Sequence, residues 1–161
     1  MLKIVGICIL IFTIYIVSRQ ICTARLARLR FLEEVQAFLL SLRRSLSSDP
    51  RPPAEVASTN CGSCLKDSGF VGRLCAGDGL KEALLESGVD KLLPSDARAL
   101  VLCLFADFGR GELADERRGL DSAISDIEPI VKRERAECEG RRRLVRVLSS
   151  AASVGLIILL I

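Results

Sequence analysis

The feature that most constrains this chain is a strongly apolar run at each end. Residues Leu2 to Val17 carry a single charge, Lys3, and the stretch from Ala151 to Ile161 carries none. A helix needs roughly 17 or more predominantly apolar residues to cross the hydrocarbon core of a membrane. We therefore expect an N-terminal transmembrane helix over residues 1–18 and a C-terminal one over residues 144–161, both in contact with membrane lipid.

Each apolar end has a second interpretation. A signal peptide also places a positive residue before an apolar run, but no A-x-A-like cleavage site follows promptly and the heavier positive charge lies after the run. The C-terminal run is short enough to form a final helix buried in a soluble core. In favour of the membrane, the small residues between Ser149 and Gly155 would allow close packing against the first segment. They predict a two-helix membrane hairpin.

Arginine gathers beside both apolar ends. Positive charges next to a membrane segment are retained on the cytoplasmic side and are attracted to anionic headgroups. We therefore predict that residues 19–143 form one cytoplasmic domain, in which reducing conditions keep the thiols free. The membrane-flanking basic residues are Arg19, Arg25, Arg28, Arg30, Arg141, Arg142, Arg143 and Arg146.

Apolar residues of the middle region recur at spacings of three and four, which is typical of amphipathic helices. One stripe runs from Leu26 to Leu46 without a Gly or Pro, and this helix is predicted to end at Ser47 to Pro50. Residues 48–79 hold several Gly and Pro and are predicted to be rich in loops, with short helices between them.

Further helices are expected over residues 80–87, from Pro94 to Gly109, and from Leu113 onward, the last with a bend at Pro129. No alternation of useful length predicts a strand. The predicted fold is all-α, a small antiparallel helical bundle between N- and C-terminal transmembrane helices.

The residue types give little support to an enzyme. The chain contains no His, which removes the commonest general base and metal ligand. Neither a phosphate-binding loop nor a dinucleotide fingerprint is present, and few aromatic residues are available to stack bases. Acids such as Asp115 and Glu116 alternate with Arg at helical spacings and are expected to form solvated ion pairs. We expect no catalytic residues, no cofactor, no metal and no nucleic-acid partner.

One cysteine spacing allows an alternative. Cys61 and Cys64 are two residues apart with Gly62 and Ser63 between them, and Cys75 follows. Such a pair can share a zinc ion or form a redox disulfide, so a membrane-anchored adaptor with a metal or redox site at Cys61, Cys64 and Cys75 is the second interpretation. Cys103 and Cys138 lie on helical stripes and are expected in the core.

The second half of the chain resembles the stage III sporulation protein AB family of endospore-forming bacteria. The resemblance is carried by Phe108, Gly109 and Glu112, by the long charged helix that follows, and by the basic residue and Leu at Arg146 and Leu148 before the apolar end. The family usually has Asp where Glu112 stands. The layout of a short anchor, a charged helix, a variable middle and a closing helix covers nearly the whole chain.

The resemblance implies a non-enzymatic membrane component of the stage III apparatus that connects mother cell and forespore. It implies a location in the mother-cell membrane facing the forespore, with a cytoplasmic domain similar to that of the type II secretion F protein. The implied partners are a secretion-type ATPase of the same apparatus and other sporulation channel proteins. A general membrane adaptor unrelated to sporulation is the remaining interpretation.

Overall fold

The computed structural model is entirely helical in the part of the chain that it describes. It describes the backbone of residues 2–48 and 50–160, and the side chains of residues 13, 16, 23–48, 50–141, 143–145 and 147. Helix accounts for 84% of the residues, and no strand occurs in these ranges. The prediction of an all-α helical bundle is confirmed.

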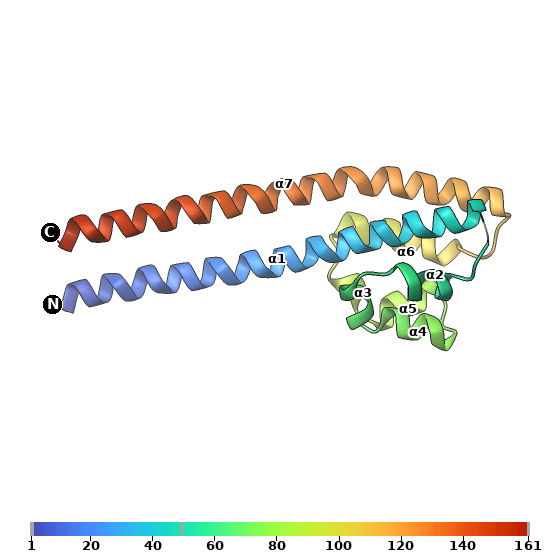
Figure 1. Ribbon diagram of the computed structural model, residues 1–161, viewed down its shortest axis with the longest axis horizontal. Helices are drawn as coiled ribbons and strands as arrows, with labels where there is room; N and C mark the ends of the chain where they lie inside the picture. The colour runs from blue at the N-terminus through green and yellow to red at the C-terminus, as the bar shows by residue number, and fades with distance from the viewer. Residues whose placement is uncertain (1, 49, 161) are drawn as a thin grey trace. The chain divides into compact units, whose positions relative to one another are not determined.

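Along the chain, a long helix precedes and another follows a series of short ones (Figure 1). The elements are α1 (Leu2–Ser48), α2 (Pro53–Asn60), α3 (Ser63–Asp67), α4 (Phe70–Ala76), α5 (Leu80–Glu86), the 3-10 helix η1 (Val89–Lys91), α6 (Ser95–Asp107) and α7 (Leu113–Leu160). The predicted end of the first helix near Ser48 and the predicted start of the last at Leu113 are both confirmed.

The chain divides into two compact units. One, which we call the helical domain, spans Arg28–Arg133, and the other, the paired ends, joins the residues up to Ala27 to those from Glu134 onward. In the paired ends, the first part of α1 lies beside the last part of α7, and Arg25 contacts Glu137 with an N–O distance of 3.5 Å. The predicted boundaries of 1–18, 19–143 and 144–161 describe membrane topology, and they stay a prediction.

Most side chains of the two predicted membrane segments lie outside the described residues. Within the described part, no helix contains a stretch long and apolar enough to cross a membrane.

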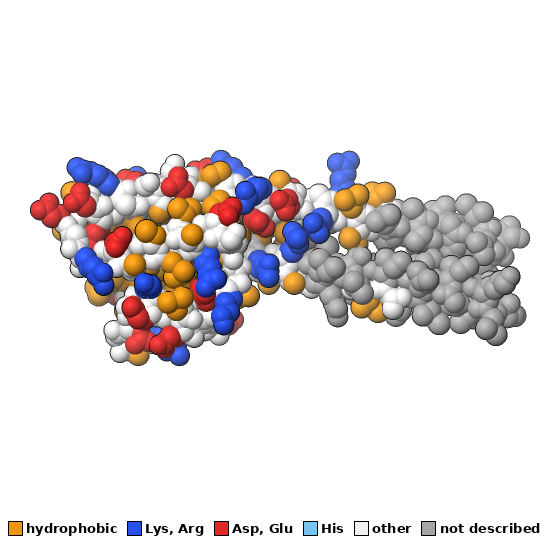
Figure 2. Space-filling view, turned by 180° about the vertical axis from the view of Figure 1, so that it is seen from behind, with side chains coloured by type: hydrophobic (Ala, Val, Ile, Leu, Met, Phe, Trp, Pro, Cys, Tyr) orange, Lys and Arg blue, Asp and Glu red, His pale blue; other side chains and the backbone are white. Residues whose placement is uncertain are grey.

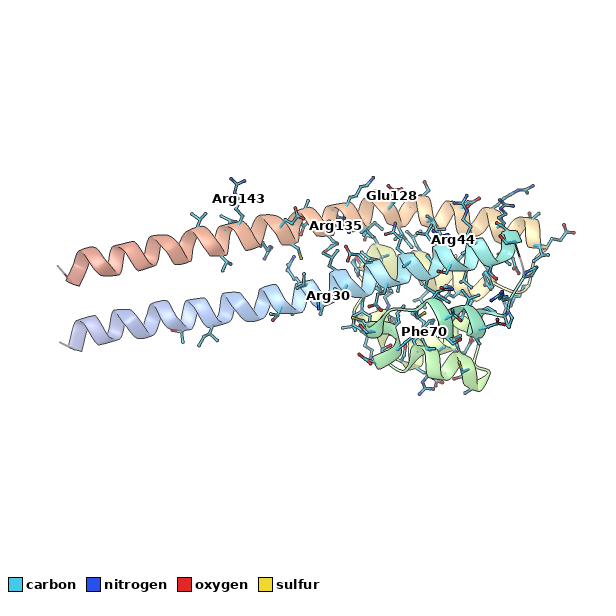
Figure 3. All side chains as sticks on the ribbon, in the orientation of Figure 1. Arg30, Arg44, Phe70, Glu128, Arg135 and Arg143 are labelled. Atoms are coloured by element: carbon cyan, nitrogen blue, oxygen red, sulfur yellow. The ribbon has the colours of Figure 1, made fainter. Side chains whose placement is uncertain are left out.

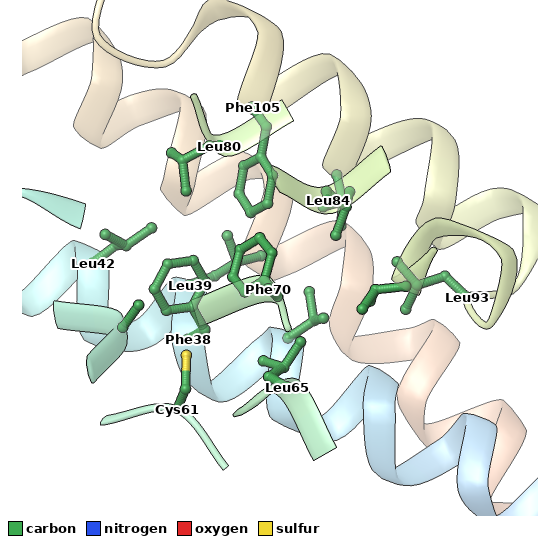
Figure 4. Packing of buried hydrophobic residues seen from close by; sticks show 14 of the residues in the cluster. Phe38, Leu39, Leu42, Cys61, Leu65, Phe70, Leu80, Leu84, Leu93 and Phe105 are labelled. Atoms are coloured by element: carbon green, nitrogen blue, oxygen red, sulfur yellow. The ribbon is translucent and has the colours of Figure 1, made fainter. Parts of the chain in front are cut away.

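The helical domain is organised around Phe38 of α1. This residue is 1% exposed, and its ring makes edge-to-face contacts with Phe70 of α4 at 5.7 Å and with Phe105 of α6 at 6.3 Å between centroids (Figure 4). Such pairs add roughly 0.5–1.5 kcal/mol beyond the apolar area that they bury. One aromatic side chain therefore ties together three helices that are far apart in sequence.

The predicted apolar stripes form the rest of this core. On α1 the buried residues Leu29, Leu32, Val35, Leu39 and Leu42 follow the spacing of three and four. On α7, Leu120, Ile127 and Val131 are buried in the same way. A salt bridge between Arg43 Nε and Asp121 Oδ1, 2.5 Å long, links α1 to α7 within the domain.

The short helices predicted within residues 48–79 are present, with less loop between them than the sequence predicted. The segment forms the short helices α2, α3 and α4, each separated from the next by two residues. Gly69 and Gly77 lie at φ 85° and 101°, a conformation that glycine adopts without steric cost, so they bound α4 while the segment stays compact. Each short helix buries only one or two side chains, such as Leu65 of α3 and Phe70 of α4.

Candidate functional site

An open groove runs between α6 and the first part of α7 in the helical domain. It encloses about 420 Å³, and both of its walls are helical. Its lining is Leu100, Cys103, Leu104, Asp107, Phe108, Gly111, Asp115, Glu116, Gly119, Ser122, Ala123 and Asp126. Grooves between packed helices are common sites for ligands and partner helices.

The apolar and the small residues of the groove lie on opposite walls. Leu100 and Leu104 come from α6 and are only partly buried, although both pack against the core. Gly119, Ser122 and Ala123 come from α7, and a Cβ added at Gly119 would meet Leu104 Cδ1 at 3.6 Å. The two walls therefore lie close together at Gly119, and the small side chains of α7 leave Leu100 and Leu104 partly exposed.

The residues of the family resemblance build the turn that closes one end of the groove. The Phe108 N–H donates to the Leu104 carbonyl at 3.1 Å and ends α6. Gly109 then takes φ 86°, and its N–H donates to Glu116 Oε1 at 2.7 Å. The Glu112 carbonyl accepts the N–H groups of Asp115 and Glu116 at 2.9 and 3.0 Å and begins α7. Phe108, Gly109 and Glu112 therefore form the turn that joins the two walls.

The charged residues of the groove all carry the same sign. Its twelve lining residues include four acids and no Lys or Arg, in a chain whose net charge is +3. Asp115 pairs with Arg118 at 3.1 Å, as the sequence predicted, but both side chains are largely exposed. Within the part of the chain that the structure describes, the carboxylates of Asp107 and Asp126 have no ion-pair partner. On the surface of the helical domain, charged side chains surround exposed apolar ones (Figure 2).

The Cys61–Cys64 loop is held by a carboxylate from a distant helix. Glu34 of α1 accepts the Cys64 N–H at 3.1 Å and the Leu65 N–H at 2.9 Å, so it caps the start of α3. A Cβ at Gly62 would collide with this carboxylate. The pattern C-G-S-C therefore reflects a close approach of Glu34 to the backbone.

The thiols of this loop are poor candidates for chemistry. Burial and the nearby Glu34 carboxylate raise the pKa of Cys61 to about 11, and burial and hydrogen bonding to Glu34 raise the pKa of Cys64. The thiolate is the nucleophile and the metal ligand, and both environments disfavour it. Cys75 is exposed on α4. Among the described residues, no group of three or more Cys, Asp or Glu is placed to hold a metal ion.

The prediction that Cys103 lies in the core is wrong. It is exposed and lines the groove, because the buried face of α6 is formed by Ala97, Val101 and Phe105 at steps of four. Cys103 is two residues from both Val101 and Phe105, which turns it to the opposite side of the helix. Cys138 is half-buried rather than buried.

The predicted basic residues are distributed along α1 and α7. Arg28 and Arg30 of the helical domain are exposed, and so are Arg141 and Arg143 of the paired ends. The side chain of Arg143 extends away from α7 (Figure 3). The side chains of Arg19, Arg142 and Arg146 lie outside the described residues.

The sequence contained a signal for the groove that the helical stripes alone did not reveal. Asp115, Gly119, Ser122 and Asp126 recur at steps of three and four on α7, so small and acidic residues share one helix face. When a helix face of small and acidic residues lies beside a helix that carries Leu, it indicates a groove between the two helices. The capping of α3 by Glu34, by contrast, joins residues 30 positions apart, so no local sequence pattern predicts it.

The chain matches no protein-family model, no curated protein and no solved structure.

Proposed function

We propose that this chain is a non-enzymatic docking component of a membrane-bound apparatus, and that its helical domain holds a cytoplasmic partner. The observation that carries the proposal is the groove between α6 and α7, whose apolar wall is left partly uncovered. Partly exposed apolar surface bordered by charge is typical of a site for another protein.

The chemistry of the domain supports a role without catalysis. The chain has no His, and the thiols of the one suggestive cysteine pair have raised pKa values. The Glu34 carboxylate beside them is committed to capping α3. These groups stabilise the domain, which leaves binding as the activity that the geometry favours.

The apparatus that fits best is the stage III sporulation machinery. The support is the resemblance through Phe108, Gly109 and Glu112, which form the turn between the two walls of the groove. In this proposal the apolar ends anchor the chain in the mother-cell membrane facing the forespore, the arginines flank the bilayer on the cytoplasmic side, and a secretion-type ATPase docks on the helical domain. Other channel proteins of the apparatus would contact the anchored chain.

Co-purification tests the docking role. The tagged full chain is co-expressed with the secretion-type ATPase of the same operon and extracted in mild detergent, beside a variant in which a Gly-Ser linker replaces residues 28–133. We expect the ATPase to co-purify with the full chain and not with the variant. Equal recovery with both chains, or with neither, would contradict the proposal.

The orientation has its own test. Cys75 is exposed in the helical domain, so a maleimide can react with it. If the domain is cytoplasmic, a membrane-impermeant maleimide should label Cys75 only after the cells are permeabilised. Labelling of Cys75 in intact cells would place the domain outside and refute a cytoplasmic partner. A Cys75→Ser variant identifies the labelled residue.

A further inference from the structure

We infer that the groove between α6 and α7 binds a basic amphipathic helix of a partner protein. The inference deepens the docking role proposed above and rests on it. It specifies where the partner binds and which chemistry the partner presents.

The shape of the groove favours a helix. Two neighbouring helices form its walls, and the side chains of a third helix can insert between them as in ordinary helix packing. α6 spans 13 residues, which at a rise of about 1.5 Å per residue gives a wall roughly 20 Å long. A partner helix of three to four turns would match this length. Its apolar residues, at spacings of three and four, would contact Leu100 and Leu104 opposite the small residues of α7.

The charge of the groove selects among such helices. Asp107 and Asp126 have no ion-pair partner in the described part of the chain. No Lys or Arg lines the groove to neutralise their charge. Lys or Arg on the flanks of a bound helix would face these carboxylates, whereas an acidic helix would be repelled. A second hollow of the domain, beside α1 and α2, is lined by Arg44 and Arg51 and lacks this selectivity. The acidic groove is therefore the site for a basic helix.

A pair of model peptides tests this selectivity. The full chain is placed in nanodiscs of zwitterionic lipid and titrated with a labelled 14-residue helix that carries Leu on one face and Lys on the other. A matched peptide has Glu in place of Lys. We expect the Lys peptide to bind at least ten times more tightly than the Glu peptide, measured by fluorescence anisotropy with empty nanodiscs subtracted. Equal affinities, or tighter binding of the Glu peptide, would overturn the inference.

Matched variants locate the bound peptide. Ser122 lines the groove, whereas Ser125 is also exposed on α7 but does not line it. Ser122→Trp should fill the groove and weaken binding at least tenfold, while Ser125→Trp should leave it unchanged. Charge reversal at Asp107 and Asp126 together should have the same effect as Ser122→Trp, and reversal at exposed Asp67 of α3 should have none. Equal effects of lining and control variants would contradict the assigned site.

Chemical modification after folding removes any concern that a variant misfolds. Among the cysteines that the structure describes, Cys103 of the groove is the exposed thiol in a Cys75→Ser chain, and Cys75 of α4 is the exposed thiol in a Cys103→Ser chain. Alkylation with a bulky maleimide should abolish Lys-peptide binding in the first chain and leave it intact in the second. Unchanged binding after modification of Cys103, verified by mass spectrometry, would refute the groove as the site.

The outcomes separate this inference from the proposed function. If the ATPase co-purifies with the full chain but Ser122→Trp does not release it, the docking role stands and the groove assignment fails. If the Lys peptide binds the groove but the ATPase does not co-purify, the groove assignment stands and the proposed partner is wrong.

Discussion

The contact between Glu34 and Gly62 makes a sharp prediction about stability. Glu34→Ala removes an acceptor from the Cys64 and Leu65 N–H groups. A hydrogen bond to a charged group contributes about 1.5–3 kcal/mol, and loss of a helix cap costs about 0.5–2 kcal/mol. Because Cys64 is only half-buried while Leu65 is buried, one of the two freed N–H groups lies near water, and we expect a combined loss of about 2–3 kcal/mol in the free energy of unfolding.

Gly62→Ala should cause a similar loss for a different reason. Gly62 lies at φ −71° and ψ 174°, which Ala adopts without strain, so its backbone does not require glycine. Its Cβ would displace the Glu34 carboxylate from α3. When Glu34 is already Ala, that conflict disappears, and the lower entropy of the unfolded chain makes Gly62→Ala neutral or stabilising by up to about 1 kcal/mol. The two substitutions should therefore be coupled by about 2 kcal/mol.

A double-mutant cycle on the full chain measures this coupling. Unfolding is followed by far-UV circular dichroism, and each single substitution should lower Tm by on the order of 10 °C. Gly72→Ala serves as a control, because a Cβ there meets nothing within 4 Å, and it should not destabilise α4. If Gly62→Ala lowers the free energy of unfolding by the same amount with and without Glu34, to within about 0.5 kcal/mol, the capping explanation is refuted.

Three further substitutions have calculable effects on the free energy of unfolding. The pKa of Cys61 is raised from 9.0 to about 11 in the folded chain, so the unfolded chain loses this proton first as the pH rises. The free energy of unfolding is therefore constant below pH 9 and falls between pH 9 and 11; at a pH of about 10.5 the loss should reach about 2 kcal/mol, and it should be absent in Cys61→Ala. Arg98→Met leaves the buried Asp90 carboxylate without its 2.6 Å partner and should cost about 2–4 kcal/mol in chemical denaturation, against less than about 1 kcal/mol for Arg118→Met in an exposed pair. Gly109→Ala should cost about 1–2 kcal/mol because φ there is 86°, and an unchanged Tm would contradict the role of this turn.

The parts of the fold that were predictable from sequence are those with long periodic patterns. Five buried residues on α1, from Leu29 to Leu42, repeat the helical spacing, so the stripe reveals both the helix and its buried face. The segment from Pro53 to Ala76 shows no such stripe, because helices of five to eight residues are too short to reveal a helical period. Its compactness comes instead from contacts with distant residues, such as Phe38 with Phe70.

The candidate site was partly accessible from sequence. Phe108, Gly109 and Glu112 were singled out by resemblance, and their physical role in the turn emerges from backbone hydrogen bonds that residue types do not encode. The groove itself depends on which side of α6 faces the core. That choice is set by Val101 and Phe105 rather than by the equally apolar Cys103, and only tertiary packing distinguishes them.

The paired ends have a practical consequence for labelling. α1 begins at Leu2 and α7 ends at Leu160, and the two helix ends lie together in Figure 1. Halves of a split fluorescent protein fused to the two termini should therefore reassemble within a single molecule. Their brightness per molecule would be independent of concentration, which makes such a fusion a reporter of the pairing of α1 and α7 in living cells.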